Sequence, residues 1–213
     1  MKKIRTVFLV MFMFLSFRYA ALGNLLMGIE LKHTDYILFE SIEVAVTIIN
    51  DTDKPMEFSR SRAAADINLV VHKQNNEFIF KKVKDKIVTD VTIMPDGRET
   101  IVIDLIKWYP INKQGKYFIS AEVEWNGKIY RTEKKVIDVV SGIEMAKVVR
   151  RLPGANASER VYTLRYWQRE RQENIFLVVE DPAMDYHYGV FDLGPIVRVM
   201  KPTLEVDRHG NVT

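Results

Sequence analysis

Apolar and polar residues alternate along most of the chain between residues 27 and 140 with a period of two. Such alternation places one face of a strand in a core and the other in water, as antiparallel sheets do. The pattern therefore predicts an all-β fold. It also predicts which side chains are buried (Val44, Val46, Ile103, Ile119 and Val123) and which are exposed (Glu43, Glu122 and Glu124).

Turn-forming residues separate the alternating segments. Asn126-Gly127 favours a two-residue hairpin turn, and Pro95-Asp96-Gly97 favours a tight turn because Pro presets φ and Gly accepts positive φ. Short strands at this spacing are typical of a β-sandwich. The predicted strands cover residues 28–33, 42–49, 66–72, 77–83, 86–93, 99–106, 116–125 and 128–139.

A second β-rich region is predicted after Ser141-Gly142, over residues 141–213. Further strands are expected near 143–151, 159–168, 174–180, 188–192 and 196–200. Residues 207–211 then read as a hairpin turn, after which only Val212 and Thr213 remain for the returning strand. Two interpretations stay open: a region truncated relative to its relatives, or a frayed last strand.

The first 23 residues have the layout of a secretory signal peptide. Lys2, Lys3 and Arg5 precede an apolar run over 7–17, and Ala21-Leu22-Gly23 offers small residues for cleavage. The alternative is an uncleaved anchor, although the run is much shorter than the roughly 20 residues that span a bilayer. We therefore expect export, with no membrane span after cleavage.

Charge and cysteine content narrow the function classes. The chain has 31 Lys and Arg against 28 Asp and Glu, but residues 1–23 hold four of the basic residues and no acid. Removing them leaves 27 against 28, which does not favour nucleic-acid binding. The chain has no Cys, which excludes disulfides and thiol ligands; for an exported protein this is typical of a bacterial envelope, whether periplasmic or extracellular.

Residues 112–119, with Gly115 and Tyr117 before Ile119, resemble the segment that opens strand F of immunoglobulin-like domains. Residues 39–50 with Pro55 are similar to strand B and its loop in bacterial secreted Ig-like and macroglobulin-type domains. The resemblance spans about residues 28–140. It implies an Ig-like antiparallel β-sandwich over 24–140, with a tyrosine corner at Tyr117, and no catalytic residues.

Two clusters are candidates for chemistry. In an extended strand Arg165, Trp167, Arg169 and Arg171 share one face, predicted to face solvent, where they could bind a polyanion or a glycan. The alternative is a charged edge strand whose Arg stems cover Trp167.

The second cluster is an acidic loop that contains Asp181, Asp185 and His187. It could bind a divalent ion, or supply acid and base groups to an enzyme. The alternative interpretation is a solvated loop without a ligand.

The sequence thus predicts an exported, non-catalytic envelope protein that acts as a binding or structural module, with an envelope protein, a glycan or a polyanion as partner and no cofactor. Two alternatives remain. One is a small hydrolase that uses the acidic loop over 180–192. The other is a protease-inhibitor or chaperone-like sandwich that acts through loops or an open sheet edge.

Overall fold

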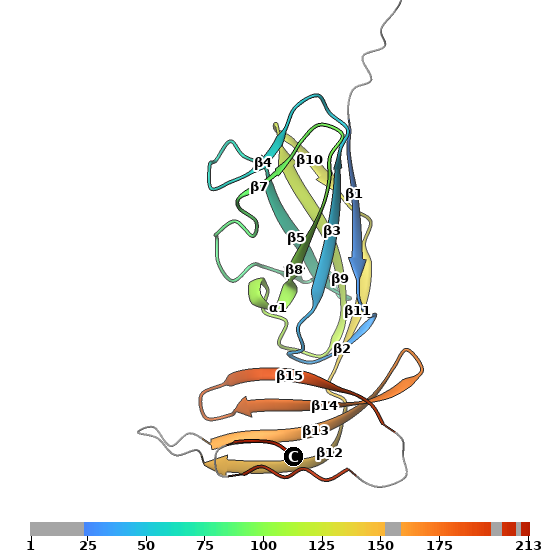
Figure 1. Ribbon diagram of the computed structural model, residues 1–213, viewed down its shortest axis with the longest axis vertical. Coiled ribbons are helices and arrows are strands. Elements are labelled where there is room, and N and C mark those ends of the chain that lie inside the picture. The colour runs from blue at the N-terminus through green and yellow to red at the C-terminus, as the bar shows by residue number, and fades with distance from the viewer. Residues whose placement is uncertain (1–23, 152–158, 197–201, 208–209) are drawn as a thin grey trace, which may run out of the picture.

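The computed structural model describes residues 24–151, 159–196, 202–207 and 210–213. The predicted signal peptide lies outside these ranges. Within them the chain forms mostly antiparallel strands, with one parallel pairing near residues 35–37, and one short helix, so the predicted all-β class is confirmed. Figure 1 shows a tall sandwich of strands above a separate, smaller sheet.

The sandwich consists of two main sheets built from residues 25–140. One sheet has the strand order β1 (Leu25–Leu31), β3 (Glu43–Asn50), β8 (Arg98–Asp104). The other has the order β2 (Asp35–Ile37), β11 (Lys135–Val140), β9 (Gly115–Trp125), β5 (Asp66–Lys73), β6 (Phe78–Ile79), with β10 (Lys128–Arg131) paired to β9. A small third ladder joins β4 (Met56–Phe58) to β7 (Val91–Ile93).

Alternation fills the sandwich core as predicted. Val44, Val46, Ile103, Ile119 and Val123 are all buried, and they belong to one continuous apolar cluster. Glu43 and Glu124 are exposed, as expected. Glu122 differs, because its carboxylate accepts a hydrogen bond from Arg131 on β10 and the side chain is half-buried.

Local hydrogen bonds account for several details of the sandwich. Asn126 and Gly127 both have positive φ, as a type I′ turn requires. The Tyr117 hydroxyl donates to the Lys113 carbonyl at 2.6 Å, the hydrogen bond that a tyrosine corner makes. The predicted strand over 99–106 ends early because the Asp104 side chain accepts from the Ile106 N–H and starts helix α1 (Leu105–Trp108).

Two predicted strands are much shorter than expected. Alternation over 77–83 and 86–93 yields only β6 and β7, and most of residues 80–90 is irregular. The contacts of this stretch are instead with segments distant in sequence: the Lys82 N–H donates to the Trp108 carbonyl, and the Lys82 and Lys86 amines donate to the Ile106 and Ser61 carbonyls. The last predicted strand of the sandwich, 128–139, is split into β10 and β11.

The smaller sheet is an antiparallel meander of four strands. Its order is β12 (Ile143–Arg151), β13 (Glu159–Arg169), β14 (Gln172–Asp181), β15 (Tyr186–Pro195). On one face Tyr162, Leu164, Leu177 and Val179 pack with Leu204 and Val206 near the C-terminus. Val206 and Val212, on either side of the turn predicted at 207–211, form an antiparallel bridge, and residues 208–209 of that turn lie outside the described residues. Residues predicted as a strand over 188–192 belong to the longer β15, and most of 196–200 lies outside the described residues.

No helix in the described ranges has the length and apolar character needed to cross a membrane.

Candidate functional site

The face of β13 that carries Arg165, Trp167 and Arg169 looks toward the sandwich. Ile37 at the end of β2 packs with Phe176 and Val178 on the neighbouring strand β14, and Trp167 lies against this cluster. Residues 35–43 of the sandwich therefore meet β13, β14 and β15 of the small sheet. We call this contact region the junction.

Arg169 is the most buried cation of the junction. Its side chain is 3% exposed and pairs with Glu40 at 2.5 Å and with Asp192 at 3.4 Å. The guanidinium also lies 4.7 Å from the Phe176 ring centroid and 5.7 Å from that of Tyr36. The prediction that Arg169 faces solvent is therefore wrong, because a carboxylate 129 residues earlier in the chain covers it.

The other residues of the predicted patch either bond to other parts of the protein or do not lie on the same face of β13. The Trp167 indole N–H donates to the Asp35 carboxylate at 2.6 Å, and Arg165 donates to the Ser141 carbonyl at 2.7 Å. Arg171 is exposed, but Glu170 and Arg171 both have positive φ and form the turn after β13. The premise of a continuous extended chain through residue 171 thus fails at the turn, and the four residues do not form one solvent-facing patch.

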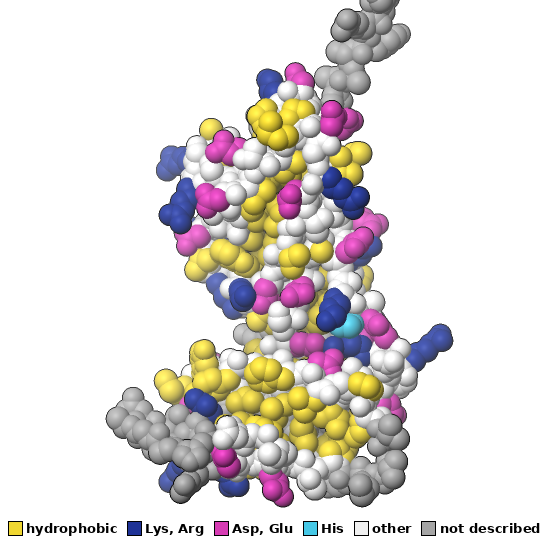
Figure 2. Space-filling model, viewed as in Figure 1, with side chains coloured by type: hydrophobic (Ala, Val, Ile, Leu, Met, Phe, Trp, Pro, Cys, Tyr) yellow, Lys and Arg dark blue, Asp and Glu magenta, His cyan; other side chains and the backbone are white. Residues whose placement is uncertain are grey.

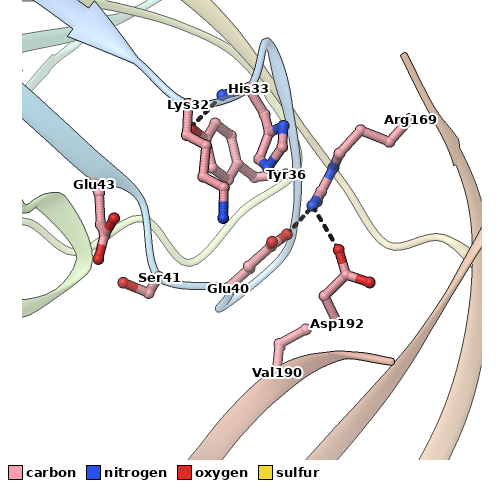
Figure 3. A pocket seen from close by; sticks show the side chains of 9 residues that line it. All are labelled: Lys32, His33, Tyr36, Glu40, Ser41, Glu43, Arg169, Val190 and Asp192. Carbon is pink, nitrogen blue, oxygen red and sulfur yellow. Dashed lines mark hydrogen bonds and ion pairs between the residues drawn. The ribbon is translucent and has the colours of Figure 1, made fainter. Parts of the chain in front are cut away.

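A small hollow of about 230 Å³ opens beside the ion pair (Figure 3). Tyr36, Glu40, Arg169 and Asp192 line its inner part, and Lys32, His33, Ser41, Glu43 and Val190 complete it. Glu40 has two partners here, since one carboxylate oxygen accepts from the Ile37 N–H at 2.8 Å as well as from Arg169. Burial raises the pKa of the Tyr36 phenol, whose oxygen accepts from the His33 N–H.

Charges of both signs border this hollow. Lys32 is exposed, and His33 Nδ1 lies 3.0 Å from the Glu170 carboxylate of the small sheet. Glu43 stands on the sandwich side. The arrangement serves to fix the two parts of the molecule to each other: ionic, aromatic and apolar contacts all cross the junction at the same place.

The predicted metal and acid–base cluster does not assemble. Asp181 is fully buried, and one of its oxygens accepts from the N–H groups of Ala183 and Met184, which stabilises the β14–β15 turn. Asp185 is exposed in that turn. His187 stacks on Phe39 of the sandwich, with ring centroids 3.4 Å apart, and lies 3.5 Å from Glu180.

Register explains the separation of these three side chains. Asp181 pairs with Tyr186, whereas His187 pairs with Glu180, so Asp181 and His187 point to opposite faces of the sheet. Among the described residues no group of three His, Asp or Glu side chains could hold a metal ion. The metal hypothesis for Asp181, Asp185 and His187 is therefore wrong.

A surface that sequence reasoning missed lies along β15. The side chains of Met184, Tyr186, Tyr188, Phe191 and Leu193 are 71%, 56%, 40%, 51% and 56% exposed. We call these five residues the aromatic surface. Figure 2 shows apolar side chains gathered over this sheet. Two irregularities in the β14–β15 register, at 179/180 and 175/176, break the alternation, which is why a period-two search does not reveal the surface.

Neighbouring groups hold part of this surface in place. Tyr186 and Tyr188 contact edge to face, with centroids 4.9 Å apart, and the Arg160 guanidinium lies 4.3 Å from the Tyr188 ring centroid. The Phe191 ring lies close above Gly189, where a Cβ would approach its Cζ atom within 3.2 Å. Within the described ranges β15 pairs only with β14, so it is an edge strand of its sheet.

Comparison with known proteins gives little to set beside this geometry. No model of a known protein family matches the chain. No curated protein sequence matches it either. Among solved structures, the crystal structure of Spo0M, a sporulation control protein from Bacillus subtilis, is similar with a TM-score of 0.37 and 10% sequence identity, covering 80% of this chain and 91% of that one.

Proposed function

We propose that the protein is an exported, non-catalytic binding module of the bacterial envelope that contacts its partner through the aromatic surface. The observation that carries the proposal is the run of five exposed apolar side chains on and beside one edge strand. The expectation of export rests on residues 1–23, and the proposed binding function rests on β15.

Exposed apolar groups of this kind are informative. Contiguous apolar surface on a single chain marks interaction sites, and Tyr, Phe and Met are enriched in protein interfaces. An edge strand adds backbone N–H and C=O groups that an extended segment of a partner can pair with. The junction holds β15 against the sandwich through the stack of His187 on Phe39 and the packing of Val190 beside Ile37, so little ordering is required when a partner binds.

The partner that fits best is an envelope protein with an extended segment bearing apolar side chains. A chaperone-like or protease-inhibitor sandwich would use the same open edge, so β15 favours this alternative over the hydrolase. The hydrolase reading needs Asp181, Asp185 and His187 to face one another, and the described geometry separates them. A glycan partner would also use the rings of Tyr186 and Tyr188 for stacking.

Site-specific photo-crosslinking in the host tests the proposal. A photoreactive phenylalanine analogue replaces Leu193, and in a control it replaces Val102, which is 60% exposed on β8. We expect a discrete protein adduct from position 193 and none from position 102. Combining Leu193 labelling with Tyr186→Ser and Phe191→Ser should remove the adduct while thermal unfolding is preserved. The same adducts from both positions, or none from 193, would overturn the proposal.

Export is tested separately. N-terminal sequencing of the protein recovered from its host is expected to begin near Asn24. Recovery of an intact Met1 from the cytosol would contradict the envelope location. The role of the aromatic surface would still be decided by the crosslinking experiment.

A further inference from the structure

Residues 78–86 combine exposed apolar side chains with four lysines, of which three bond to other atoms of the sandwich and Lys84 is exposed. Phe78, Phe80 and Val83 are 55%, 80% and 47% exposed. Phe78 lies on β6, the edge strand next to β5, and residues 80–86 follow as irregular chain. In Figure 1 the chain between β5 and β7 runs along the flank of the sandwich away from β1. We call residues 78–86 the flank loop.

Three lysines fasten the flank loop to the sandwich. Lys81 donates to the Asn68 side chain at 3.0 Å and to the Asp85 carbonyl at 2.7 Å. Lys82 donates to the Ile106 carbonyl at 2.7 Å through its amine, and its N–H donates to the Trp108 carbonyl at 2.8 Å. Lys86 donates to the Ser61 carbonyl at 2.8 Å. The exposed position of Phe80 is therefore held by a fixed backbone.

These anchoring bonds are not ion pairs. All of the lysine partners above are neutral carbonyl or amide oxygens, and two carboxylates, Asp66 and Glu124, line a hollow beside Lys86 and Arg62 without an ion pair to either within the described residues. Lys84, Arg60 and Arg62 are exposed and have no ion-pair partner within the described part of the chain. Residues 80–90 contain four Lys and two Asp, and Arg60, Lys84 and Lys86 border one hollow with Asp85 and Thr89.

We infer that the flank loop docks the protein onto an anionic lipid bilayer. Phe80 and Val83 enter the headgroup boundary, while Lys84, Arg60 and Arg62 contact lipid phosphates. Apolar insertion and a basic patch are the two signals that together give stable peripheral binding. A bilayer fits better than a soluble polyanion, because a bilayer offers an apolar region that can bury two exposed apolar side chains and a soluble polyanion does not. The inference does not depend on the proposed function, since β15 lies in the other sheet.

The absence of Cys in the chain allows a clean position-specific test. The full chain carries a single environment-sensitive fluorophore at Val83→Cys, or in the control at Val102→Cys. Each is mixed with vesicles of phosphatidylcholine alone and of phosphatidylcholine with phosphatidylglycerol. We expect a blue shift at position 83 with the anionic vesicles, smaller at high salt, and no shift at position 102. Both labelled proteins carry residues 1–23, so any vesicle binding by that segment is common to them and a difference between positions 83 and 102 reports on the flank loop.

Two sets of substitutions test the apolar and the basic contribution to membrane binding separately. Phe80→Ser, at a position 80% exposed, should remove most of the blue shift without changing thermal unfolding. Arg60→Gln with Lys84→Gln should shift the docking equilibrium by roughly fivefold per removed cation. No shift at position 83, or an equal shift with neutral vesicles, would overturn the inference. A response to soluble polyphosphate without one to anionic vesicles would replace the bilayer with a polyanion.

Discussion

At the scale of single residues, three buried tyrosines combine packing with a hydrogen bond to the backbone. The Tyr109 hydroxyl donates to the Leu69 carbonyl at 2.6 Å and accepts from the Leu69 N–H at 3.0 Å, so it joins the segment after α1 to β5. Tyr117 donates to Lys113, and Tyr36 accepts from His33 at the junction. Burial is the largest cause that raises the pKa of each phenol above its usual value of 10.0.

These raised pKa values predict a loss of stability in alkali. A phenol whose pKa is higher in the folded than in the unfolded state binds its proton more tightly when folded. Its contribution is therefore fully present below pH 10.0 and is lost as the pH rises through the folded-state pKa. Urea unfolding should show the free energy of unfolding falling above about pH 10.

The matched variants for this measurement are Tyr109→Phe and, at an exposed position, Tyr186→Phe. Tyr109→Phe lowers stability at neutral pH because the Leu69 groups lose their partner, and it should flatten the alkaline decline. Tyr186→Phe should leave the decline unchanged. An identical pH profile for the wild type and Tyr109→Phe would show that this phenol does not contribute to it.

At the scale of elements, the passage from β11 to β12 depends on Gly142. Its φ is +69°, and a Cβ there would lie 3.1 Å from both Ile37 Cδ1 and the Tyr166 carbonyl oxygen. Gly142→Ala should therefore destabilise the protein by about 1–3 kcal/mol. Gly28, inside β1, has open space around its Cα, so Gly28→Ala should be neutral or stabilise by up to about 1 kcal/mol. Thermal unfolding of both variants decides this, and equal shifts would contradict it.

Elements that depend on local pattern were predictable from the sequence. Alternation at Val44 and Val46 and the turn at Asn126-Gly127 each involve interactions between near neighbours or a buried face of one strand. The flank loop was not predictable, because Lys86 finds its partner at Ser61, 25 residues earlier. The junction was not predictable for the same reason, because nothing near Arg169 in the sequence indicates that Glu40 will cover it. The face of a strand is a local property, but what packs on that face is not.

At the scale of the whole molecule, one contact region decides how the small sheet sits on the sandwich. The Arg169 pair with Glu40, the Trp167 bond to Asp35 and the His187 stack on Phe39 all cross it. The Arg169 and Glu40 side chains are only 3% and 12% exposed, although a hollow opens beside them, so the pair is largely buried. In such surroundings a charge that loses its partner is costly. The orientation of the aromatic surface relative to the flank loop should therefore depend on Arg169.

Arg169→Ala leaves Glu40 buried without its cation and should cost about 3–5 kcal/mol in the free energy of unfolding. Replacing both charges, with Glu40→Gln and Arg169→Met, should restore much of that loss because no unpaired charge remains. Arg131→Ala removes an exposed pair with Glu122 and should cost about 1 kcal/mol or less.

Spin labels at Val102→Cys on the sandwich and Met184→Cys on the small sheet measure the distance between the two parts. Their distance distribution should broaden in Arg169→Ala, stay narrow in Arg131→Ala, and narrow again in the double variant. A distribution that stays narrow in Arg169→Ala would mean that the apolar contacts around Ile37 hold the junction without the ion pair.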